Sequence, residues 1–566
     1  MGQARRQQAR AAARSAGDER PAPASSRPGE QQPHHWRLEI YAAALLLATL
    51  LAYLPTFNAG FVRWDDQYYV EDSNLLQDTD ALKRIWNPFA HDTQQYYPLV
   101  FSSYWLEYHL WGLDARSYHV VNVGLHAINA LLVLSIVLEL GVAPPVAAIA
   151  AALFALHPAQ VASVAWISEL KNTLSGLFYL LAALAYLRHR RSGAWSAYGL
   201  CLLAFVGALL SKTQTLTLPA SLVLADWALQ RLGRVRRAGI VAVLARALPM
   251  LALGALAGLV TMQFEERPWT HAFTPVERLL VSTNAALFYA RTFCAPLWLS
   301  PVYPEWHVSV GDWRWWVAPL LCALAAAALV AGRRRIPELV AWSVAHFYIT
   351  LIPVLGVFSF NFQTYTFVAD HFLYLSLVGG GLAAAIGIER AAAWSPTAAP
   401  RAMAAAGLLM LTTCAVLTYQ ECTHWRDNLA FWTRVRDRDP DGFLGHYNLG
   451  NHYRFKGQWA EAVPFYRRAA EIRSHVDFAF LRYAEALGHA SGAAAVVDMC
   501  TQRLRRDPGF YPAYLERGGR EEELGRTADA ARDYEATLQL APRDSAQWND
   551  AQRRRAQLAA RGAPGG

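Results

Sequence analysis

Long apolar runs, separated by short clusters of basic residues, dominate this chain. Hydrophobic residues make up 54% of the sequence and charged residues 17%, so the two kinds must be segregated along it. A helix needs about 20 predominantly apolar residues to cross a bilayer. Runs of near-spanning length lie at about 38–54, 119–140, 143–157, 170–187, 195–211, 214–229, 238–262, 313–331, 336–357, 370–388 and 402–419. The pattern predicts an all-α, polytopic membrane domain over residues 38–420, with about 11 transmembrane helices.

The basic clusters predict how this domain is oriented, because cytoplasmic loops carry an excess of Lys and Arg. Residues 1–37 are predicted to be a disordered basic tail in the cytoplasm, and 38–54 an uncleaved signal anchor. Alternating crossings then place the clusters Arg188–Arg191 and Arg231–Arg237 in the cytoplasm as well. This clustering accounts for the net charge of +8 and argues against nucleic-acid binding.

A further apolar stretch, about 279–299, is interrupted by arginine and proline residues. Arg291 and Pro296 lie inside it, and Pro301 follows directly. Such interruptions favour a re-entrant or interfacial segment over a crossing. Excluding this segment leaves about eleven crossings, puts Arg333–Arg335 in the cytoplasm and puts the C-terminal region outside. Twelve crossings would place that basic cluster outside, against the charge rule.

The same topology places three segments on the outer side of the membrane. They are the loop at about 55–118, the segment His157–Lys171, and the loop at about 358–369, which ends at Asp370 and His371. The first is too long and too aromatic for a simple connector, and loops of that size are usually functional. We expect a site where these three segments meet.

The last part of the chain, residues 421–562, repeats with a period of 34 residues. Small residues at one position let two helices pack closely, mostly aromatic residues at a second fill the gap between helices, and Pro at a third ends a helix. The sets are Gly450, Ala484 and Gly518; Tyr466, Cys500 and Tyr534; and Ser474, Pro508 and Pro542. This period and these residue types predict an α-solenoid of tetratricopeptide (TPR) repeats. Because three repeats are near the minimum for a stable stack, we expect the array to lean on the membrane domain.

Two adjacent carboxylates, Asp65 and Asp66, follow the first apolar run within the aromatic segment Phe61–Tyr68. Carboxylates at the membrane surface cost free energy, so they usually mark a functional site. Neighbouring like charges also raise the pKa of one member of a pair, which suits a general base. An exposed acidic turn or helix start would carry the same pair, so this chemistry alone leaves both interpretations open.

The order of several motifs along the chain is more specific. They are Asp65-Asp66, Tyr96-Tyr97-Pro98-Leu99, Leu110-Trp111-Gly112-Leu113, Tyr118-His119-Val120-Val121-Asn122, Leu125-His126, His157-Pro158, Ser163-Val164-Ala165-Trp166-Ile167-Ser168-Glu169-Leu170-Lys171, Ser211-Lys212, Thr217-Leu218-Pro219, Ala369-Asp370-His371 and Tyr374-Leu375. Over roughly residues 55–560 the chain resembles the transmembrane-and-TPR O-mannosyltransferase family and its bacterial relatives, which are GT-C glycosyltransferases with C-terminal TPR repeats.

The resemblance implies transfer of a sugar, mannose or another hexose, from a polyprenyl-phosphate donor to a Ser or Thr hydroxyl of a protein on the outer face. It implies no metal and no cofactor beyond the lipid-linked substrate. Asp65 is the implied general base, and Asp66 would orient the acceptor or tune its neighbour. The implied donor-binding residues are Lys171, Lys212, His371, Glu169, Tyr374 and His157.

Simpler roles fit some of these residues equally well. Lys171 and Lys212 lie at helix ends, where a Lys commonly extends its ammonium group to the interface. His157 precedes a Pro, a position where a structural His is common. The sequence also departs from the bacterial pattern at Gln160, Ala162, Leu170 and Asn172, where relatives tend to carry His, acidic, basic and acidic residues, and at His371, where Arg is usual. Fewer charges leave open a different donor and a weakened or altered enzyme.

Two other functional classes fit parts of the sequence. One is a non-catalytic, membrane-anchored TPR scaffold or assembly factor that recruits a partner. The other is a transporter, although transporters keep charges near the bilayer midplane, whereas here the charges gather at the ends of the runs. An enzyme, unlike a scaffold, requires Asp65 beside a cavity that contains Lys171 or Lys212. Six scattered Cys predict neither a zinc site nor a disulfide framework. The Ala- and Arg-rich composition points to a bacterial inner membrane, with the site and the repeats in the periplasm.

Overall fold

The computed structural model describes residues 35–90, 92–93, 95–264, 273–357, 361–393 and 399–562, and all regular structure in these ranges is helical. The chain divides into two compact units, residues 1–44 and 45–566. Of the first unit, the described residues form the start of helix α2 (His35–Ala52), so His35, Trp36 and Arg37 are helical. Residues 1–34, most of the expected basic tail, lie outside the described residues.

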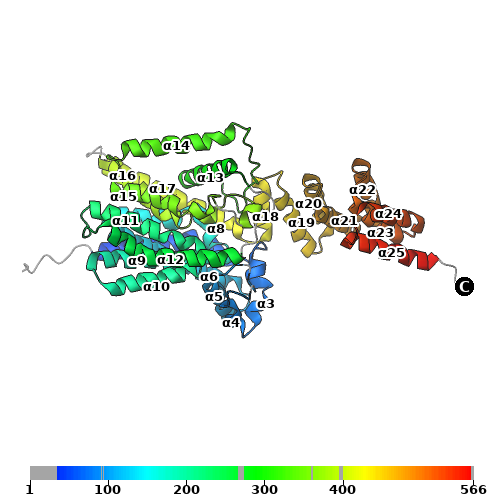
Figure 1. Ribbon diagram of the computed structural model, residues 1–566, viewed down its shortest axis with the longest axis horizontal. Helices are drawn as coiled ribbons and strands as arrows, with labels where there is room; N and C mark the ends of the chain where they lie inside the picture. Colours follow the sequence, from blue (N-terminus) through cyan, green and yellow to red (C-terminus); the bar gives the residue numbers. More distant parts are fainter. Residues whose placement is uncertain are drawn as a thin grey trace, which may run out of the picture. The chain divides into compact units, whose positions relative to one another are not determined.

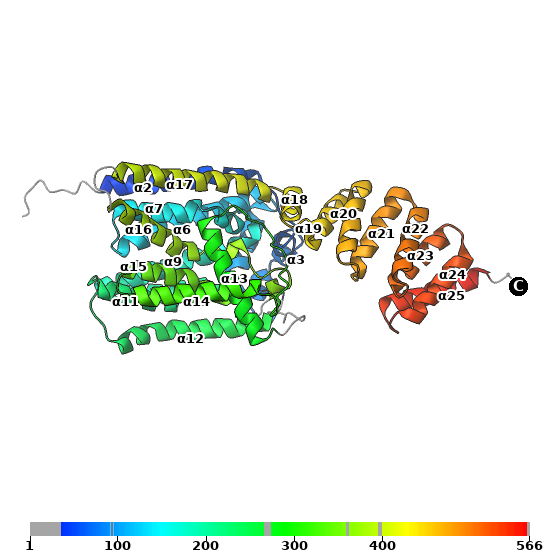
Figure 2. The same cartoon turned by 90° about the horizontal axis from the view of Figure 1, so that it is seen from above.

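Each predicted apolar run of the membrane domain forms a helix, because backbone groups among apolar side chains must be satisfied within the segment. The long helices of the second unit lie roughly parallel to one another in both views, except for α13 (Pro275–Cys294), which Figure 2 shows steeply inclined to the rest (Figures 1 and 2). They are α6 (Ala115–Glu139), α7 (Pro144–Leu156), α9 (Leu170–Ser192), α10 (Trp195–Leu209), α11 (Leu218–Arg231), α12 (Ile240–Phe264), α13 (Pro275–Cys294), α14 (Arg314–Gly332), α15 (Glu338–Ile349), α16 (Ser376–Ala393) and α17 (Ala399–Cys422).

The chain is an integral membrane protein. Among the described residues, 4 helices are long and apolar enough to span a bilayer, and up to 5 if the bent pair Pro144–Leu156 and Pro158–Val164 counts as one span. Shorter apolar helices lie beside them, so the total of about eleven crossings stays a prediction. Helix α14 exposes most of its apolar side chains, with only 6% of its spanning window buried, as expected of a helix that faces lipid.

The segment expected to be interrupted, about 279–299, forms the continuous helix α13 as far as Cys294. Arg291 lies within the last turns of this helix and does not break it, whereas Pro296 lies beyond its end. Helix α13 is not among the helices that meet the length and composition of a span.

The first outer loop is a small helical layer of its own. It contains η1 (Leu54–Asn58), η2 (Gln67–Glu71), α3 (Asn74–Gln77), α4 (Ala81–Ile85) and α5 (Pro98–Trp111). Its aromatic side chains form a hydrophobic core with Tyr118 of α6 and with Ile167 and Leu170. The hydroxyl of Tyr104 donates a hydrogen bond to the carbonyl of Ile167 at 2.8 Å. This core accounts for part of the aromatic content of the loop, namely Tyr69, Tyr97, Phe101 and Tyr104.

The two other outer segments are short and compact. Residues 158–169 form η3 (Pro158–Gln160), α8 (Val161–Val164) and η4 (Ile167–Glu169), and they are buried throughout. The third segment contains η7 (Asn361–Thr364) and η8 (Asp370–Leu373), while residues 358–360 lie outside the described residues. It follows η6 (Ile352–Val354).

The C-terminal region consists of helix pairs with the predicted period. After η9 (Thr423–Trp425) and α18 (Asn428–Arg438) come α19 (Phe443–Phe455), α20 (Trp459–Ile472), α21 (Asp477–Ser491), α22 (Ala493–Arg506), α23 (Tyr511–Glu523), α24 (Thr527–Leu540) and α25 (Ala546–Gly562). The first helices of the three pairs begin at Phe443, Asp477 and Tyr511, which are 34 residues apart. Their identification as TPR repeats stays a prediction.

The small residues of the repeat act as expected. A Cβ atom at Gly450 would lie 2.7 Å from the ring of Tyr466, and one at Gly518 would lie 2.8 Å from the ring of Tyr534. Real Cβ contacts are longer than this, so both positions need glycine for α19 and α23 to approach the next helix. In the middle pair, Ala484 and Cys500 pack in one hydrophobic core.

Candidate functional site

The three outer segments come together around one large cavity. Its volume is about 1280 Å³. The walls come from the first outer loop, the start of α9, the residues after α10, the third outer segment and helices α18 and α19. The Arg, Lys, Asp and His residues among its lining are Arg63, Asp65, Asp92, Lys171, Lys212, His371, His452 and Lys456. Asp65, Lys171 and Lys212 thus share one cavity, which is the arrangement that an enzyme requires and a scaffold does not.

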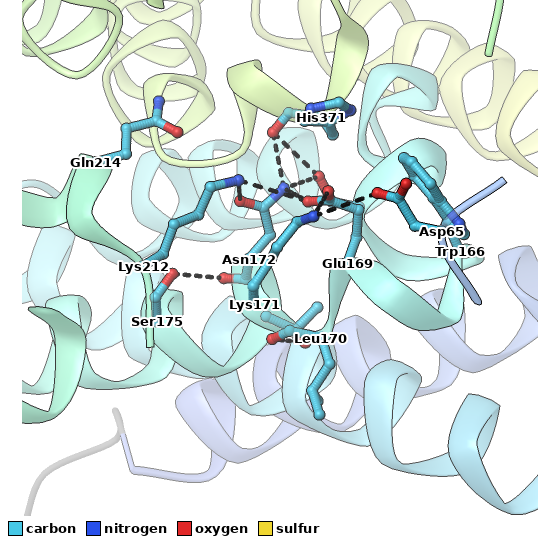
Figure 3. Close-up of polar contacts among 12 residues, drawn as sticks. Asp65, Trp166, Glu169, Leu170, Lys171, Asn172, Ser175, Lys212, Gln214 and His371 are labelled. Carbon is cyan, nitrogen blue, oxygen red and sulfur yellow. Dashed lines mark hydrogen bonds and ion pairs between the residues drawn. The ribbon is translucent and has the colours of Figure 1, made fainter. Parts of the chain in front are cut away.

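Asp65 presents its carboxylate to this cavity from the first outer loop (Figure 3). Its side chain is 29% exposed, and its Oδ2 atom lies 3.8 Å from the Nζ atom of Lys171. Burial raises the pKa of Asp65 above its usual value, while the charge of Lys171 acts in the opposite direction. A carboxylate with a raised pKa and access to a cavity can accept a proton from a bound hydroxyl group.

Glu169 lies behind the two lysines and holds both. Its Oε1 atom is 3.0 Å from Nζ of Lys171, and its Oε2 atom is 3.5 Å from Nζ of Lys212. The Glu169 side chain is 1% exposed, whereas each lysine is 9% exposed. Because Glu169 does not line the cavity, its role is to position two ammonium groups that do. Without a carboxylate there, two buried cations so close together would be costly.

Asn172, one turn into α9, completes the arrangement (Figure 3). Its Oδ1 atom accepts a hydrogen bond from Nζ of Lys212 at 2.7 Å. Its Nδ2 atom donates to Oε2 of Glu169 at 2.5 Å and to the carbonyl of His371 at 2.9 Å. Sequence reasoning noted Asn172 only as a departure from the bacterial pattern, yet its side chain orients Lys212. An amide can do this because it donates to one group and accepts from another.

His371 lines the cavity, and its ring lies against aromatic side chains. The ring makes edge contacts with Trp166, at 5.9 Å between centroids, and with Phe362, at 5.3 Å. Lys171 also lies over the ring of Trp166 at 5.8 Å and over the ring of Tyr69 at 5.2 Å. His371 therefore borders the lysine pair from the third outer segment.

Asp66 turns away from the cavity. Its Oδ2 atom accepts from the backbone N–H of Val62, and its Oδ1 atom accepts from the backbone N–H of Ser168, both at 2.8 Å. Burial raises the pKa of Asp66 to about 7, and these two hydrogen bonds oppose that shift. The expected role in orienting the acceptor by contact does not fit this placement. Asp66 instead joins the first two outer segments and keeps Asp65 in place.

Two of the predicted donor-binding residues lie elsewhere. His157 does not line the cavity, and its Nε2 atom lies 3.0 Å from the carbonyl oxygen of Phe293. Tyr374 is buried between helices, where its hydroxyl lies 3.0 Å from Nδ1 of His126 and accepts from Nδ2 of Asn129 at 2.9 Å. These contacts give both residues a structural role in helix packing, as the alternative for His157 anticipated.

Among the departures at Gln160, Ala162, Leu170 and Asn172, the described contacts place the side chain of Asn172 against the lysine pair. Gln160 is buried and donates to the carbonyls of Phe154 and Tyr374, both at 3.3 Å. Ala162 and Leu170 are buried in apolar surroundings. The residues that replace charged groups at these three positions therefore serve packing between segments.

An aromatic wall adjoins Asp65, and sequence reasoning did not single it out. The ring of Trp64 meets that of Tyr365 at 4.9 Å and that of Trp432 at 5.4 Å, both edge-on. All three side chains line the cavity. The position of Trp64 beside the acidic pair was visible in the sequence, but its two partners come from distant segments that only folding brings together.

The charged groups suit an anion better than a metal ion. Lys171 and Lys212 face the cavity, and the carboxylates beside them are the buried Glu169 and the partly exposed Asp65. Within the described ranges, no three His, Cys, Asp or Glu side chains gather as metal ligands would. The absence of a cofactor stays an expectation.

Comparison with known proteins gives relatives of one kind. No protein-family model matches the chain. The protein O-mannosyl-transferase Tmtc1 of Drosophila melanogaster is 31% identical over 192 residues, which cover 32% of this chain and 22% of that protein. The human protein O-mannosyl-transferase TMTC4 is 24% identical over 496 residues, 74% of this chain and 64% of that protein. These similarities confirm the resemblance to the transmembrane-and-TPR O-mannosyltransferases that the ordered motifs predicted.

The chain spans less than two thirds of the length of these curated relatives. Among solved structures, the chain is similar to ArnT from Cupriavidus metallidurans bound to undecaprenyl phosphate. That similarity has a TM-score of 0.34 and 16% sequence identity, over 82% of this chain and 80% of that one.

Proposed function

We propose that this chain is a membrane glycosyltransferase of the GT-C type. It moves a sugar, mannose or another hexose, from a polyprenyl-phosphate donor to a Ser or Thr hydroxyl of a protein. The observation that carries the proposal is that Asp65, Lys171 and Lys212 line one cavity. A base and two cations within one cavity are what glycosyl transfer from a phosphate requires.

The donor enters on the side of the lysines. There the lining also includes Leu216, Thr261 and Val354, at the ends of apolar helices and in the short segments beside them. A lipid-borne sugar whose chain stays in the bilayer can present its phosphate to Lys171 and Lys212 from this side. The sugar, one bond away from that phosphate, then lies next to Asp65.

The reaction follows from these positions. The carboxylate of Asp65 accepts the proton of the acceptor hydroxyl as its oxygen forms a bond to the anomeric carbon. The bond between that carbon and the phosphate oxygen breaks, and the electron pair leaves with the phosphate. A phosphodiester with one negative charge thereby becomes a monoester with two. Lys171 and Lys212 stabilise the added charge, while Glu169 and Asn172 keep both ammonium groups in place.

The membrane-anchored scaffold is the second candidate. A scaffold requires the helix pairs that begin at Phe443. It does not require two buried lysines that face a cavity with a carboxylate. Buried cations are costly, and Lys212 and Lys171 are both nine-tenths buried at the cavity. The proposal places the cavity and the repeats on the outer side of the membrane, as the basic clusters predict. The Ala- and Arg-rich composition makes that side the periplasm of a bacterium.

The direct test is transfer by the purified full-length protein in lipid nanodiscs. Labelled polyprenyl-phosphate hexoses and a Ser/Thr-containing acceptor are supplied, and product is measured by mass spectrometry. Asp65→Asn is nearly isosteric but cannot accept the proton, so transfer should fall at least about a hundredfold while the donor still binds. Asp80→Asn is the matched control, because Asp80 lies in the same loop, is 69% exposed and does not line the cavity.

Two results would count against the proposal. Wild-type transfer rates in Asp65→Asn would show that the base is wrongly assigned. A wild-type protein that is inactive with every lipid-linked hexose would favour the scaffold.

A further inference from the structure

We propose that helix α19, the first helix of the repeat region, forms the acceptor-binding wall of the cavity and holds the acceptor polypeptide in an extended conformation beside Asp65. This inference rests on the proposed function and deepens it. It assigns the binding surface to one face of one helix, rather than to the repeat array as a whole.

One face of α19 lines the cavity on the side of the repeat region. The α19 residues that line the cavity are Tyr447, Asn448, Asn451, His452 and Phe455, and Lys456 follows directly after the helix. Asn448, Asn451 and Phe455 are three and four residues apart, so they follow one face of the helix. Phe455 is 60% exposed although it is a large aromatic residue. A polar and aromatic face of this kind is directed at the cavity that contains Asp65.

The two Asn side chains are held in a defined orientation. The hydroxyl of Tyr466 donates to Oδ1 of Asn451 at 2.7 Å, Nδ2 of Asn451 donates to Oδ1 of Asn448 at 3.3 Å, and Nδ2 of Asn448 donates to the carbonyl of Leu444 at 3.0 Å. Each amide nitrogen has a second hydrogen. A row of oriented amides can pair with successive peptide groups, which also combine one donor with one acceptor.

Contacts between the repeat region and the first outer loop bring this face to Asp65. The backbone N–H of Arg63 donates to Oδ1 of Asn428 at 2.6 Å, and the guanidinium of Arg63 lies 5.2 Å from the centre of the Phe455 ring. Trp64 packs against Trp432 of α18. The two residues that precede Asp65 are thus tied to α18 and α19, so a chain bound on α19 lies within reach of the base.

The chemistry of the two sides distinguishes acceptor from donor. The lysine side takes an anion, and the donor sugar must stay near it, since its anomeric carbon is bonded to the phosphate. The α19 side presents two amides and aromatic rings beside His452 and Lys456. The amides and rings suit peptide groups and apolar side chains better than a lipid chain. The helix pairs continue beyond α19 to Gly562, so the bound ligand can be a chain longer than one or two residues.

The test compares two acceptors with one donor. One acceptor is a capped tripeptide with a single Thr, and the other is an unstructured peptide of roughly twenty residues that contains the same sequence. The variants are Asn448→Ala with Asn451→Ala, and Phe455→Ala alone, which removes an exposed side chain and leaves the core intact. Asn549→Ala is the matched control, because Asn549 lies in α25 and does not line the cavity.

The expected result is a split between KM and kcat. KM for the long peptide should rise about tenfold in the double variant, since each lost hydrogen bond contributes a factor of a few. Transfer to the tripeptide and donor binding should stay at wild-type levels in both variants and in the control. This pattern would separate acceptor binding from catalysis and from folding.

Four results would overturn the inference. An unchanged KM for the long peptide, with normal transfer to the tripeptide, would refute the α19 wall and leave the proposed function standing. The same conclusion would follow if the wild type did not prefer the long peptide to the tripeptide. Transfer to a soluble oligosaccharide instead of both peptides would refute the α19 wall together with the protein acceptor of the proposed function. If the wild type transferred to no acceptor at all, the proposed function itself would fail.

Discussion

Nζ of Lys171 lies 3.8 Å from Oδ2 of Asp65, so the first turn of α9 and the first outer loop meet at a single pair of opposite charges. Lys171 also contacts Glu169 at 3.0 Å and therefore links the proposed base to the proposed donor side. A cation in this position can both hold Asp65 in its ionised form and receive the phosphate.

Removing either cavity lysine should slow transfer more than it weakens donor binding. In Lys171→Ala and Lys212→Ala, the rate at saturating donor should fall about a hundredfold, while donor affinity falls less. The reason is that the charge on the phosphate grows as the bond breaks, so each cation interacts more strongly with the transition state. Lys83→Ala is the control, because Lys83 is 82% exposed and pairs with the surface residue Asp80. A loss of donor affinity with an unchanged rate at saturating donor would show that the lysines bind the ground state and the transition state equally.

Transfer should depend on pH with a bell-shaped profile. Asp65 acts as the ionised base and burial raises its pKa, so the rate should rise with pH through a limb above the usual range of an Asp. Lys212, in the loop after α10, acts as a cation, and burial lowers its pKa to about 8, so the rate should fall above about pH 8. In Lys212→Arg the charge persists at higher pH, and the alkaline limb should move upward. An alkaline limb that stays in place would assign it to another group.

Asp66→Asn should destabilise the first outer loop. Asp66 accepts backbone hydrogen bonds from Val62 and Ser168 with its two oxygens, whereas Asn offers one oxygen and turns an N–H donor toward the second N–H. The cost for such a buried mismatch is about 1–3 kcal/mol, which should lower Tm in a thermal unfolding measurement. Transfer should fall as well, because Asp65 is displaced. Asp80→Asn should change neither Tm nor transfer. An unaltered Tm in Asp66→Asn would contradict the role of Asp66 in joining the first two outer segments.

The predicted topology can be tested with single cysteines at Ser73, Ser192 and Ser545 in a background without native Cys. Ser73 lies in the first outer loop and Ser545 near the last helix, so both should react with a membrane-impermeant thiol reagent added from outside. Ser192 lies at the end of α9 beside the basic cluster Arg188–Arg191 and should react only after the membrane is permeabilised. Reaction of the cysteine at position 192 from outside would refute the orientation.

Much of the fold was predictable because its signals are local or periodic. The apolar runs predicted the positions of α6, α9 and α12 closely, since a segment in lipid must satisfy its own backbone. The spacing of Gly450, Tyr466 and their counterparts predicted helix pairs that begin 34 residues apart. The burial of Tyr104 and Tyr118 in the first outer loop was less visible, because aromatic residues serve a core and a binding surface equally well.

The sequence by itself determined which residue types are present near the proposed chemistry: an acidic pair after the first apolar run and lysines at two helix ends. Tertiary structure decided which of them share a cavity. Consecutive residues in a turn point in different directions, so Asp65 faces the cavity while Asp66 binds Val62 and Ser168. Packing between distant segments placed Glu169 behind both lysines, gave Asn172 its role on Lys212 and brought α19 to the cavity. No local pattern encodes these relationships, because each depends on side chains from several segments that only the folded chain brings into contact.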